Sequence, residues 1–356
     1  MEELSKIFSY GIKVGAENKK QSENDMQIHF LGTSAGTPTV ERNVTSIALQ
    51  PEGRSEWYMV DCGEGTQQQL LRSPLSLPKL TKIFITHLHG DHCYGLPGLL
   101  SSRGLMQASE PLDIYGPRGL KPMLEAMLKY SYVRPMYKLR IHEFNESSEL
   151  YDDVNEKVKT VKLSHDVPSY AYVIQEQDFA GAFDIDKAKA AGIPPGPDYG
   201  RLKNGETVTL EDGRIFSGAE FVSDPINGRK IIIAGDNDSA ELLANDMADA
   251  DVMIHEATHT IEAAAGLSFK SRHSTAASVC EIAKNVGLAN LILTHFSPRF
   301  HLRPQNGRSG MDDIADEVKA HYDGSWHLAR DFDQYKLGRD KKVECVFRRK
   351  NRWESK

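Results

Sequence analysis

Histidine and aspartate side chains gather in one short stretch of the chain. His87, His89, Asp91 and His92 lie within six consecutive positions. Successive side chains of a strand alternate, so His87 and His89 point the same way, and Asp91 and His92 follow on a turn. Imidazole and carboxylate groups in two such pairs can hold two divalent metal ions. A polar surface turn is the alternative, but this spacing favours a metal site.

The elements around this stretch are those that such a site needs. Residues 82–85 form an apolar run that predicts a strand, and residues 93–100 predict the start of a helix. Further predicted strands end at His165, Asp236 and His295. Because ligands and catalytic groups gather at one rim of a sheet in α/β hydrolytic sites, the sequence predicts an α/β fold with its site at that rim.

Composition restricts the class of protein. The chain has 356 residues and a net charge of −7, so any nucleic-acid-binding surface has to be local. Its four cysteines show no pairing pattern, which favours a reducing compartment. No apolar run approaches the roughly 20 residues of a membrane span, and residues 1–25 resemble neither a signal nor a transit peptide. We expect a cytoplasmic protein with a polar N-terminal extension.

Two later segments differ from the rest in composition. Residues 179–205 include a Pro- and Gly-rich run that predicts a protrusion rather than a core element. Tyr199, Arg201 and Lys203 on this protrusion could grip a phosphate backbone, or the segment is a simple surface loop. Residues 336–356 are basic, which fits either a solvated tail or a nucleic-acid contact.

The histidine and aspartate pattern resembles the metallo-β-lactamase superfamily, and further motifs resemble ribonuclease Z, the endonuclease that removes 3′ trailers from precursor tRNA. The motifs are residues 31–43, the Gly-Pro-rich segment, 255–258, 273–275 and 294–299. The resemblance, to the short bacterial-type form, implies an αββα sandwich over residues 26–335. An inserted flexible exosite arm at 179–205 and the basic tail at 336–356 complete the implied organisation.

The resemblance also implies two zinc ions per subunit, with manganese or another divalent metal as alternatives. The implied ligands are His87, His89 and His165 for one ion, Asp91, His92 and His295 for the other, and Asp236 bridging both. Asp61 is either a turn or helix-cap residue or a group that orients a ligating histidine.

The implied reaction is cleavage of precursor tRNA just after the discriminator nucleotide. A hydroxide between the two ions attacks, and the products are a tRNA 3′-hydroxyl and a 5′-phosphorylated trailer. His273 is the implied general acid, oriented by Glu256, and Asp91 is counted among the catalytic residues.

The resemblance further implies contacts with RNA by a set of loop and arm residues. These are Arg42, Asn43, Gly196, Pro197, Tyr199, Arg201, Lys203 and Arg299. In a homodimer the arm of one subunit would grip the tRNA elbow for the site of the other. Two positions depart from the family pattern: Asn237 stands where threonine is frequent, and Glu41 stands where a neutral or basic residue is usual.

Three other functions are compatible with parts of the pattern. A broader zinc phosphodiesterase or 3′ exoribonuclease would use the same metals. A hydrolase of small esters or thioesters would need no protruding arm. A non-catalytic RNA-binding protein would not need the complete ligand set together with Glu256 and His273.

Overall fold

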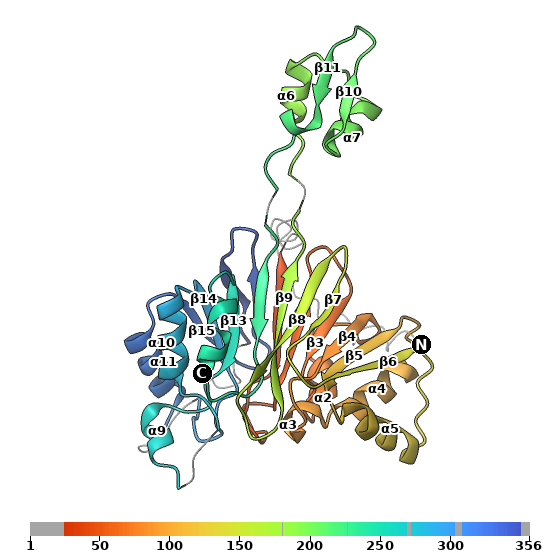
Figure 1. Cartoon of the computed structure of the whole chain (residues 1–356). Coiled ribbons are helices and arrows are strands. Elements are labelled where there is room, and N and C mark those ends of the chain that lie inside the picture. The colour runs from red at the N-terminus through yellow and green to blue at the C-terminus, as the bar shows by residue number, and fades with distance from the viewer. Residues whose placement is uncertain (1–24, 180, 226, 269–271, 303–307, 350–356) are drawn as a thin grey trace, which may run out of the picture.

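The computed structural model describes residues 25–349 except 180, 226, 269–271 and 303–307. Two large sheets lie against each other, and helices cover their outer faces (Figure 1). The predicted αββα sandwich is confirmed. Within these residues no helix is both long enough and apolar enough to span a lipid bilayer.

The first sheet has eight strands in the order β17-β16-β1-β2-β3-β4-β5-β6. They are β1 (Met26–Gly32), β2 (Ser46–Gln50), β3 (Trp57–Val60), β4 (Leu80–Phe84), β5 (Leu112–Pro117), β6 (Leu139–Phe144), β16 (Gln334–Leu337) and β17 (Val343–Phe347). The strands β3 to β6 run parallel. The helical elements between these strands are α2 (Thr66–Leu70), η2 (Leu77–Lys79), α3 (Gly90–Cys93), α4 (Leu96–Leu105) and α5 (Leu120–Tyr130).

The second sheet has seven strands in the order β15-β14-β13-β12-β9-β8-β7. They are β7 (Glu149–Asp152), β8 (Glu156–Leu163), β9 (Ser169–Glu176), β12 (Lys230–Ile233), β13 (Val252–Glu256), β14 (Asn290–Thr294) and β15 (Ser325–Leu328). Its helical elements are η4 (Ala240–Leu243), α8 (Ala244–Met247), α9 (Ile261–Ala265), α10 (Ala276–Val286) and α11 (Met311–His321).

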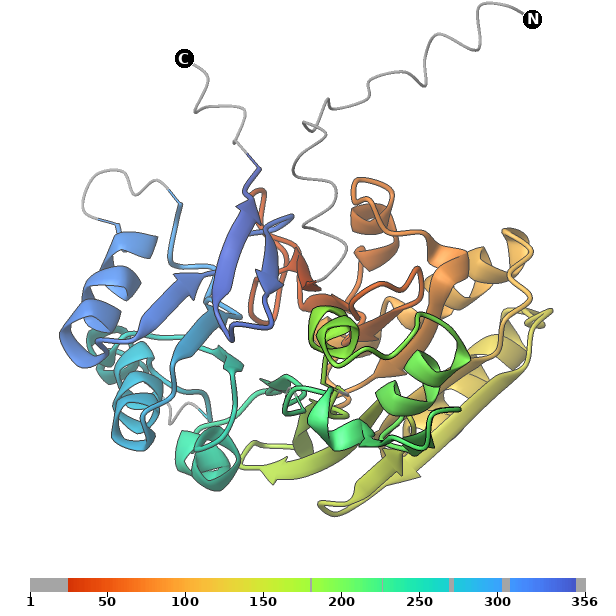
Figure 2. The same cartoon turned by 90° about the horizontal axis from the view of Figure 1, so that it is seen from above.

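Three apolar layers hold the sandwich together. The central layer lies between the sheets and contains Phe84 of the first and Ile231 of the second. The outer layers lie under α4 and α5 on one side and under α10 and α11 on the other. A strand covered on both faces needs apolar side chains on both, which explains the continuous Ile231–Ile233 run of β12. Figure 2 views the same layers from above.

The ends of several strands meet at one edge of the sandwich. β8 and β12 are both antiparallel to β9, so β8, β12, β13 and β14 point the same way. Their carboxyl ends therefore lie side by side. The backbone of Tyr170, at the start of β9, accepts from Gly235 and donates to Thr86, which joins this edge to the loop after β4.

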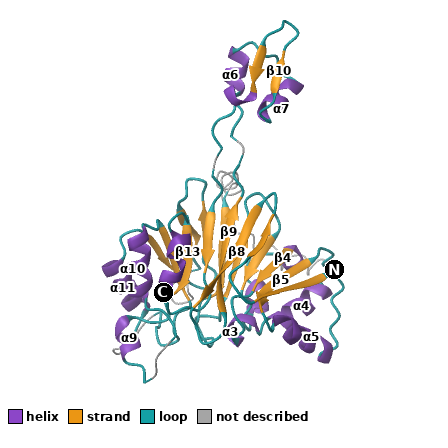
Figure 3. Cartoon of the chain, in the orientation of Figure 1, coloured by secondary structure: helices purple, strands orange, loops and turns teal. Residues whose placement is uncertain are grey.

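The inserted segment is a folded unit that projects from the sandwich (Figure 3). Its elements are α6 (Ile185–Ala190), α7 (Pro197–Lys203), β10 (Thr207–Thr209), β11 (Ile215–Ser217) and η3 (Gly218–Glu220). It has its own apolar core, made of Ala188, Ile193, Leu202, Val208 and Phe221. The arm therefore extends beyond the predicted end at residue 205. The Pro- and Gly-rich run, which predicts no core element of the sandwich, contains helix α7, because Pro197 occupies its first turn, where a missing N–H is tolerated.

The described part of the predicted basic tail belongs to the first sheet rather than to a solvated terminus. Strands β16 and β17 pair with each other, and β16 pairs with β1. Lys341 forms an ion pair with Asp251, and Arg348 forms one with Asp333, each at 2.8 Å. Acidic side chains of the sandwich thus neutralise these cations. Residues 350–356, like the extension 1–24, lie outside the described residues.

Candidate metal centre and active site

The seven predicted metal ligands meet at the strand-end edge of the sandwich. Four loops carry them, after β4, β8, β12 and β14. Ligand atoms lie within 4.8 Å of one another in each of two groups of these residues, which are His87, His89, His165 and Asp236, and Asp91, His92 and His295. Asp236 and His295 form a third such group with His273. The structure thus brings together residues that are up to 208 positions apart in the chain.

Asp236 lies between these two groups. Its Oδ2 is 3.6 Å from Nε2 of His87 and 3.8 Å from Nε2 of His165. Its Oδ1 is 3.3 Å from Nε2 of His92 and 3.4 Å from Nε2 of His295. Burial opposes its ionisation, but the imidazoles around it hold the pKa of Asp236 well below its usual value. The two oxygens of one ionised carboxylate face different groups, as bridging of two cations requires.

Four imidazoles of the cluster are oriented by acceptors outside it. The Nδ1 contacts are His87 with Thr86 Oγ1 (3.0 Å), His92 with Asp61 Oδ2 (2.7 Å), His165 with the carbonyl of Arg272 (2.9 Å) and His295 with Thr258 Oγ1 (3.0 Å). Both threonine hydroxyls donate their own proton to a carboxylate, so each accepts from the ring. An imidazole that donates from Nδ1 keeps a lone pair on Nε2, and these lone pairs face the cluster.

The donor set fits two divalent cations. Nε2 of His92 lies 3.3 Å from Nε2 of His295, and two ligands at about 2.0–2.1 Å from a tetrahedral ion are about 3.3–3.4 Å apart. Nε2 of His87 is buried and has no hydrogen-bond partner among the described residues. Lone pairs that converge in this way repel one another unless a cation lies between them.

Two residues of the centre adopt a backbone conformation that glycine normally occupies. Asp61 has φ of 59° and His295 has φ of 56°, and such strain is concentrated at functional sites. The carboxylate of Asp61 accepts from the backbone N–H and the hydroxyl of Thr86, both at 2.8 Å, as well as from His92. Asp61 therefore orients a histidine of the cluster, whereas helix α2 begins only after Gly65.

Glu256 and His273 form a pair beside the cluster. Nδ1 of His273 donates to Oε1 of Glu256 at 2.9 Å. The carboxylate is fully buried, whereas the imidazole is a quarter exposed. Burial opposes the charge of the imidazole, but the neighbouring carboxylate outweighs it and raises the pKa of His273 to about 9. Such an imidazole carries a proton at neutral pH and presents its other nitrogen away from Glu256.

Asn237, which departs from the family pattern, and Thr258, which the sequence analysis did not assign, organise this region. The buried Asn237 donates its backbone N–H to Glu256 at 2.8 Å, and its side chain contacts Nε2 of His255 at 3.1 Å. The hydroxyl of Thr258 bridges Glu256 and His295. The Glu256–His273 pair and the histidine and aspartate cluster are therefore parts of one hydrogen-bonded network. The place of Thr258 in the 255–258 motif was the signal that could have identified it.

The loop after β1 reaches the cluster directly. The backbone N–H of Gly36 donates to Oδ2 of Asp91 at 2.7 Å. Gly36 has φ of 68° and open space around its α-carbon, so the backbone can approach the carboxylate closely. This hydrogen bond ties the loop after β1 to a residue of the cluster.

One predicted RNA contact in the neighbouring loop has a different role. The side chain of Arg42 is buried and donates to the carbonyls of Ser297 and Phe300, at 3.1 and 2.6 Å. It therefore holds the loop after β14 in place, because backbone carbonyls of that loop occupy its guanidinium. Asn43 is half-buried and Arg299 is exposed, so both remain accessible at this edge.

The predicted arm contacts also divide into core and surface. The hydroxyl of Tyr199 donates to the carbonyl of Ile193 at 3.0 Å, and its ring lies 5.1 Å from that of Phe183. Its half-buried ring packs against the arm core, and its contact with RNA stays a prediction.

The other arm residues lie on its surface. Gly196, Pro197 and Lys203 are exposed. Arg201 is also exposed, but it forms ion pairs with Asp198 at 3.4 Å and Glu206 at 3.2 Å.

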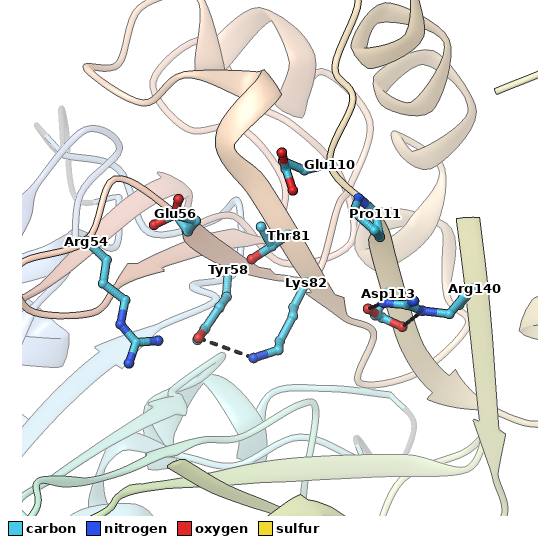
Figure 4. A pocket seen from close by; sticks show the side chains of 9 residues that line it. All are labelled: Arg54, Glu56, Tyr58, Thr81, Lys82, Glu110, Pro111, Asp113 and Arg140. Atoms are coloured by element: carbon cyan, nitrogen blue, oxygen red, sulfur yellow. Dashed lines mark hydrogen bonds and ion pairs between the residues drawn. The ribbon is translucent and has the colours of Figure 1, made fainter. Parts of the chain in front are cut away.

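A hollow of about 530 Å³ lies apart from the cluster, where β4 and β5 begin (Figure 4). Three of its charged side chains form ion pairs. Arg140 binds Asp113, and Lys82 binds Glu156 at 2.8 Å. The chemistry-bearing residues are therefore at the opposite end of the strands.

Comparisons with known proteins agree with this geometry. The family model described as anti-Pycsar protein Apyc1 matches residues 26–183, less than half of the chain. The short form of human tRNase Z has a similar structure, with a TM-score of 0.60 and 28% identity, covering 86% of this chain and 98% of that one. The metallo-β-lactamase fold protein YhfI from Bacillus subtilis, at 16% identity and a TM-score of 0.58, covers 88% of this chain and 100% of its own and supports the fold.

Curated relatives extend over nearly the whole chain. Ribonuclease Z of Crocosphaera subtropica is 45% identical over 314 residues, which are 88% of this chain and 99% of that protein. Ribonuclease Z of Marinobacter nauticus is 43% identical over 321 residues, 90% and 99% of the two chains. Identity at this level over this length, together with the cluster geometry, identifies the chain as a member of the ribonuclease Z family.

Proposed function

We propose that the protein is an endoribonuclease that removes the 3′ trailer from precursor tRNA just after the discriminator nucleotide. The observation that carries the proposal is the seven-ligand cluster with the Glu256–His273 pair beside it, in a chain of the ribonuclease Z family. The expected products are a tRNA with a 3′-hydroxyl and a trailer with a 5′-phosphate.

The cluster is proposed to hold two divalent cations, with zinc as the first choice. His87, His89 and His165 would bind one ion, and the second histidine and aspartate group would bind the other, with Asp236 shared. When bound, such ions supply a hydroxide nucleophile at neutral pH and neutralise charge on the phosphate. Manganese is the alternative, because imidazole and carboxylate ligands accept it as well.

His273 is proposed to donate the proton that the leaving 3′-oxygen needs. Its Nδ1 is bonded to Glu256, so the proton would come from Nε2. The Glu256 carboxylate raises the pKa of His273 to about 9, which favours the protonated, proton-donating form. Because Glu256 also accepts from the backbone of Asn237, its position is fixed before substrate binds.

We propose that the arm grips tRNA for the site of a partner subunit. The arm leaves β9 at Glu176, whereas the cluster lies near Ser169 at the other end of this strand. Eight residues of strand span about 26 Å, so the arm root lies far from its own metal centre. Exposed apolar side chains at the end of α4 and in the loop after α5 support a second copy, with Leu105, Tyr132 and Met136 each more than 80% exposed.

Such an enzyme is proposed to work in the cytoplasm. All four cysteines are free thiols, which is consistent with a reducing compartment.

The decisive experiment uses a precursor tRNA labelled at its 5′ end and carrying a trailer. We expect one labelled product ending at the discriminator, and no cleavage after treatment with a chelator until zinc or manganese is restored. A ladder of shortening products would instead indicate a 3′ exoribonuclease. Absence of chelator-sensitive cleavage would refute the proposal.

A further inference from the structure

The base of the arm is tied to the opposite sheet by charged side chains. Phe179 is the first aromatic residue after β9, and the guanidinium of Arg339 lies 3.8 Å from its ring centroid. Arg339 belongs to the turn between β16 and β17, whereas β9 belongs to the second sheet. A residue of the outgoing arm segment is thus stacked on a cation supplied by the first sheet.

Glu52 connects this stack to the returning arm segment. Its carboxylate accepts from Nη2 of Arg339 at 2.8 Å and from Nη2 of Arg229 at 2.8 Å. Arg229 directly precedes β12, is fully buried, and also donates to both carboxylate oxygens of Glu176. One carboxylate of the turn after β2 therefore holds cations that belong to both sheets.

A second cation of the same turn holds the returning segment. Nζ of Lys341 donates to the carbonyl of Gly228 and to the carboxylate of Asp251, both at 2.8 Å. The carbonyl of Leu337 accepts from Arg229 at 2.9 Å. The turn between β16 and β17 thus contacts both arm segments exactly where they join the sandwich, and a cavity of about 240 Å³ lies beside the stack.

We propose that this turn is a clamp that sets the direction of the arm and that Arg339 is a positioning residue for long RNA substrates. The inference rests on the proposed function, in which the arm grips tRNA. A planar guanidinium is suited to this task, because it can bind a carboxylate in a bidentate manner and stack on an aromatic ring simultaneously. Without the contact between Arg339 and Phe179, the arm would adopt additional orientations in which it cannot contact the RNA.

The test compares Arg339→Ala with Arg54→Ala. Arg54 lines the same cavity but forms no ion pair within the described part of the chain, so its loss removes an equal charge without touching the arm. For Arg339→Ala we expect KM for precursor tRNA to rise about 2- to 5-fold, as the fraction of competent arm orientations falls. The kcat for precursor tRNA and the turnover of bis(p-nitrophenyl) phosphate should not change. Arg339→Lys should restore part of the effect.

A second measurement follows the arm without any substrate. A dye is attached through Lys203→Cys in a Cys345→Ser background, because the other three cysteines are buried. We expect its fluorescence anisotropy to fall in Arg339→Ala and to stay unchanged in Arg54→Ala. If the wild type fails to cleave precursor tRNA while the anisotropy still falls, the proposed function fails and the clamp stands.

Three outcomes would overturn the clamp. Unchanged KM and anisotropy in Arg339→Ala would show that the stack does not direct the arm. Equal KM changes in Arg339→Ala and Arg54→Ala would assign the effect to long-range attraction of phosphate. Slower hydrolysis of the small diester would show damage to the sandwich itself.

Discussion

Removing the arm is expected to weaken precursor tRNA binding while changing its salt dependence only slightly. Residues 184–221 carry five basic and seven acidic side chains, a net charge of −2. Lys189, Arg201 and Arg214 are each paired with an acid of the arm. Lys187 and Lys203 form no ion pair within the described residues, so two cations remain for phosphate contacts.

The magnitude follows from counterion release. Each neutralised phosphate adds about −0.9 to the slope of log affinity against log salt. Two lysines therefore account for a slope change of about 2, and the remaining arm affinity has to come from backbone and apolar contacts, which salt screens little.

The assay replaces residues 178–227 with Asn-Gly, a two-residue turn that can join β9 to β12. KM for precursor tRNA is measured from about 50 to 200 mM salt in the wild type and in this variant, with bis(p-nitrophenyl) phosphate as the control substrate. We expect a higher KM at every salt concentration, slopes that differ by about 2 or less, and unchanged turnover of the small diester.

A slope difference of about 4 or more would refute this reasoning, because Arg201 and Arg214 would then have to leave their acidic partners to bind phosphate. Equal loss of activity on both substrates would show that the arm stabilises the sandwich instead of binding RNA.

Three further predictions concern the centre and the core. His273→Ala should lower kcat for precursor tRNA by about 10²- to 10⁴-fold, while metal content measured by emission spectroscopy stays equal to that of a His142→Ala control; loss of metal would make His273 a ligand. Asp61→Asn removes the charged acceptor of His92 and should weaken metal binding about 10- to 100-fold in a chelator competition; unchanged affinity would contradict the orienting role. Burial lowers the pKa of His29 to about 4, so the unfolded chain binds a proton first and stability falls with pH below about 6.5. Between pH 7 and 5, urea unfolding of the wild type should lose about 2 kcal/mol more than that of His29→Leu, and equal losses would disprove the assignment.

The metal centre was the most predictable part of the molecule. Six consecutive positions from His87 to His92 supply four of the seven proposed ligands locally, and the strand-end positions of His165, Asp236 and His295 supply the other three. Strands that run in the same direction have their carboxyl ends at one edge of the sheet, whatever the loops between them contain. The approximate arrangement of the ligands therefore follows from their positions at the ends of predicted strands.

Contacts made by residues distant in sequence were not predictable in this way. Arginine often contacts phosphate, so Arg42 was predicted to bind RNA. Only the fold shows that its guanidinium donates hydrogen bonds to backbone carbonyls about 255 positions away in the chain. The strand Val343–Phe347 was likewise not predicted, because the basic residues around it suggested a solvated tail or a nucleic-acid contact. Its β-branched and aromatic residues favour a strand and were the available signal.

The strained backbone of the centre has a consequence for engineering this enzyme. Glycine at position 61 or 295 would relieve about 1–3 kcal/mol of strain at each site, but Asp61→Gly would also leave the backbone N–H and the hydroxyl of Thr86 without their buried acceptor. Both changes would remove a side chain that contacts the cluster. The same side chains therefore hold the strained backbone and orient the cluster, so we expect substitutions at these two positions to impair metal binding without a gain in stability.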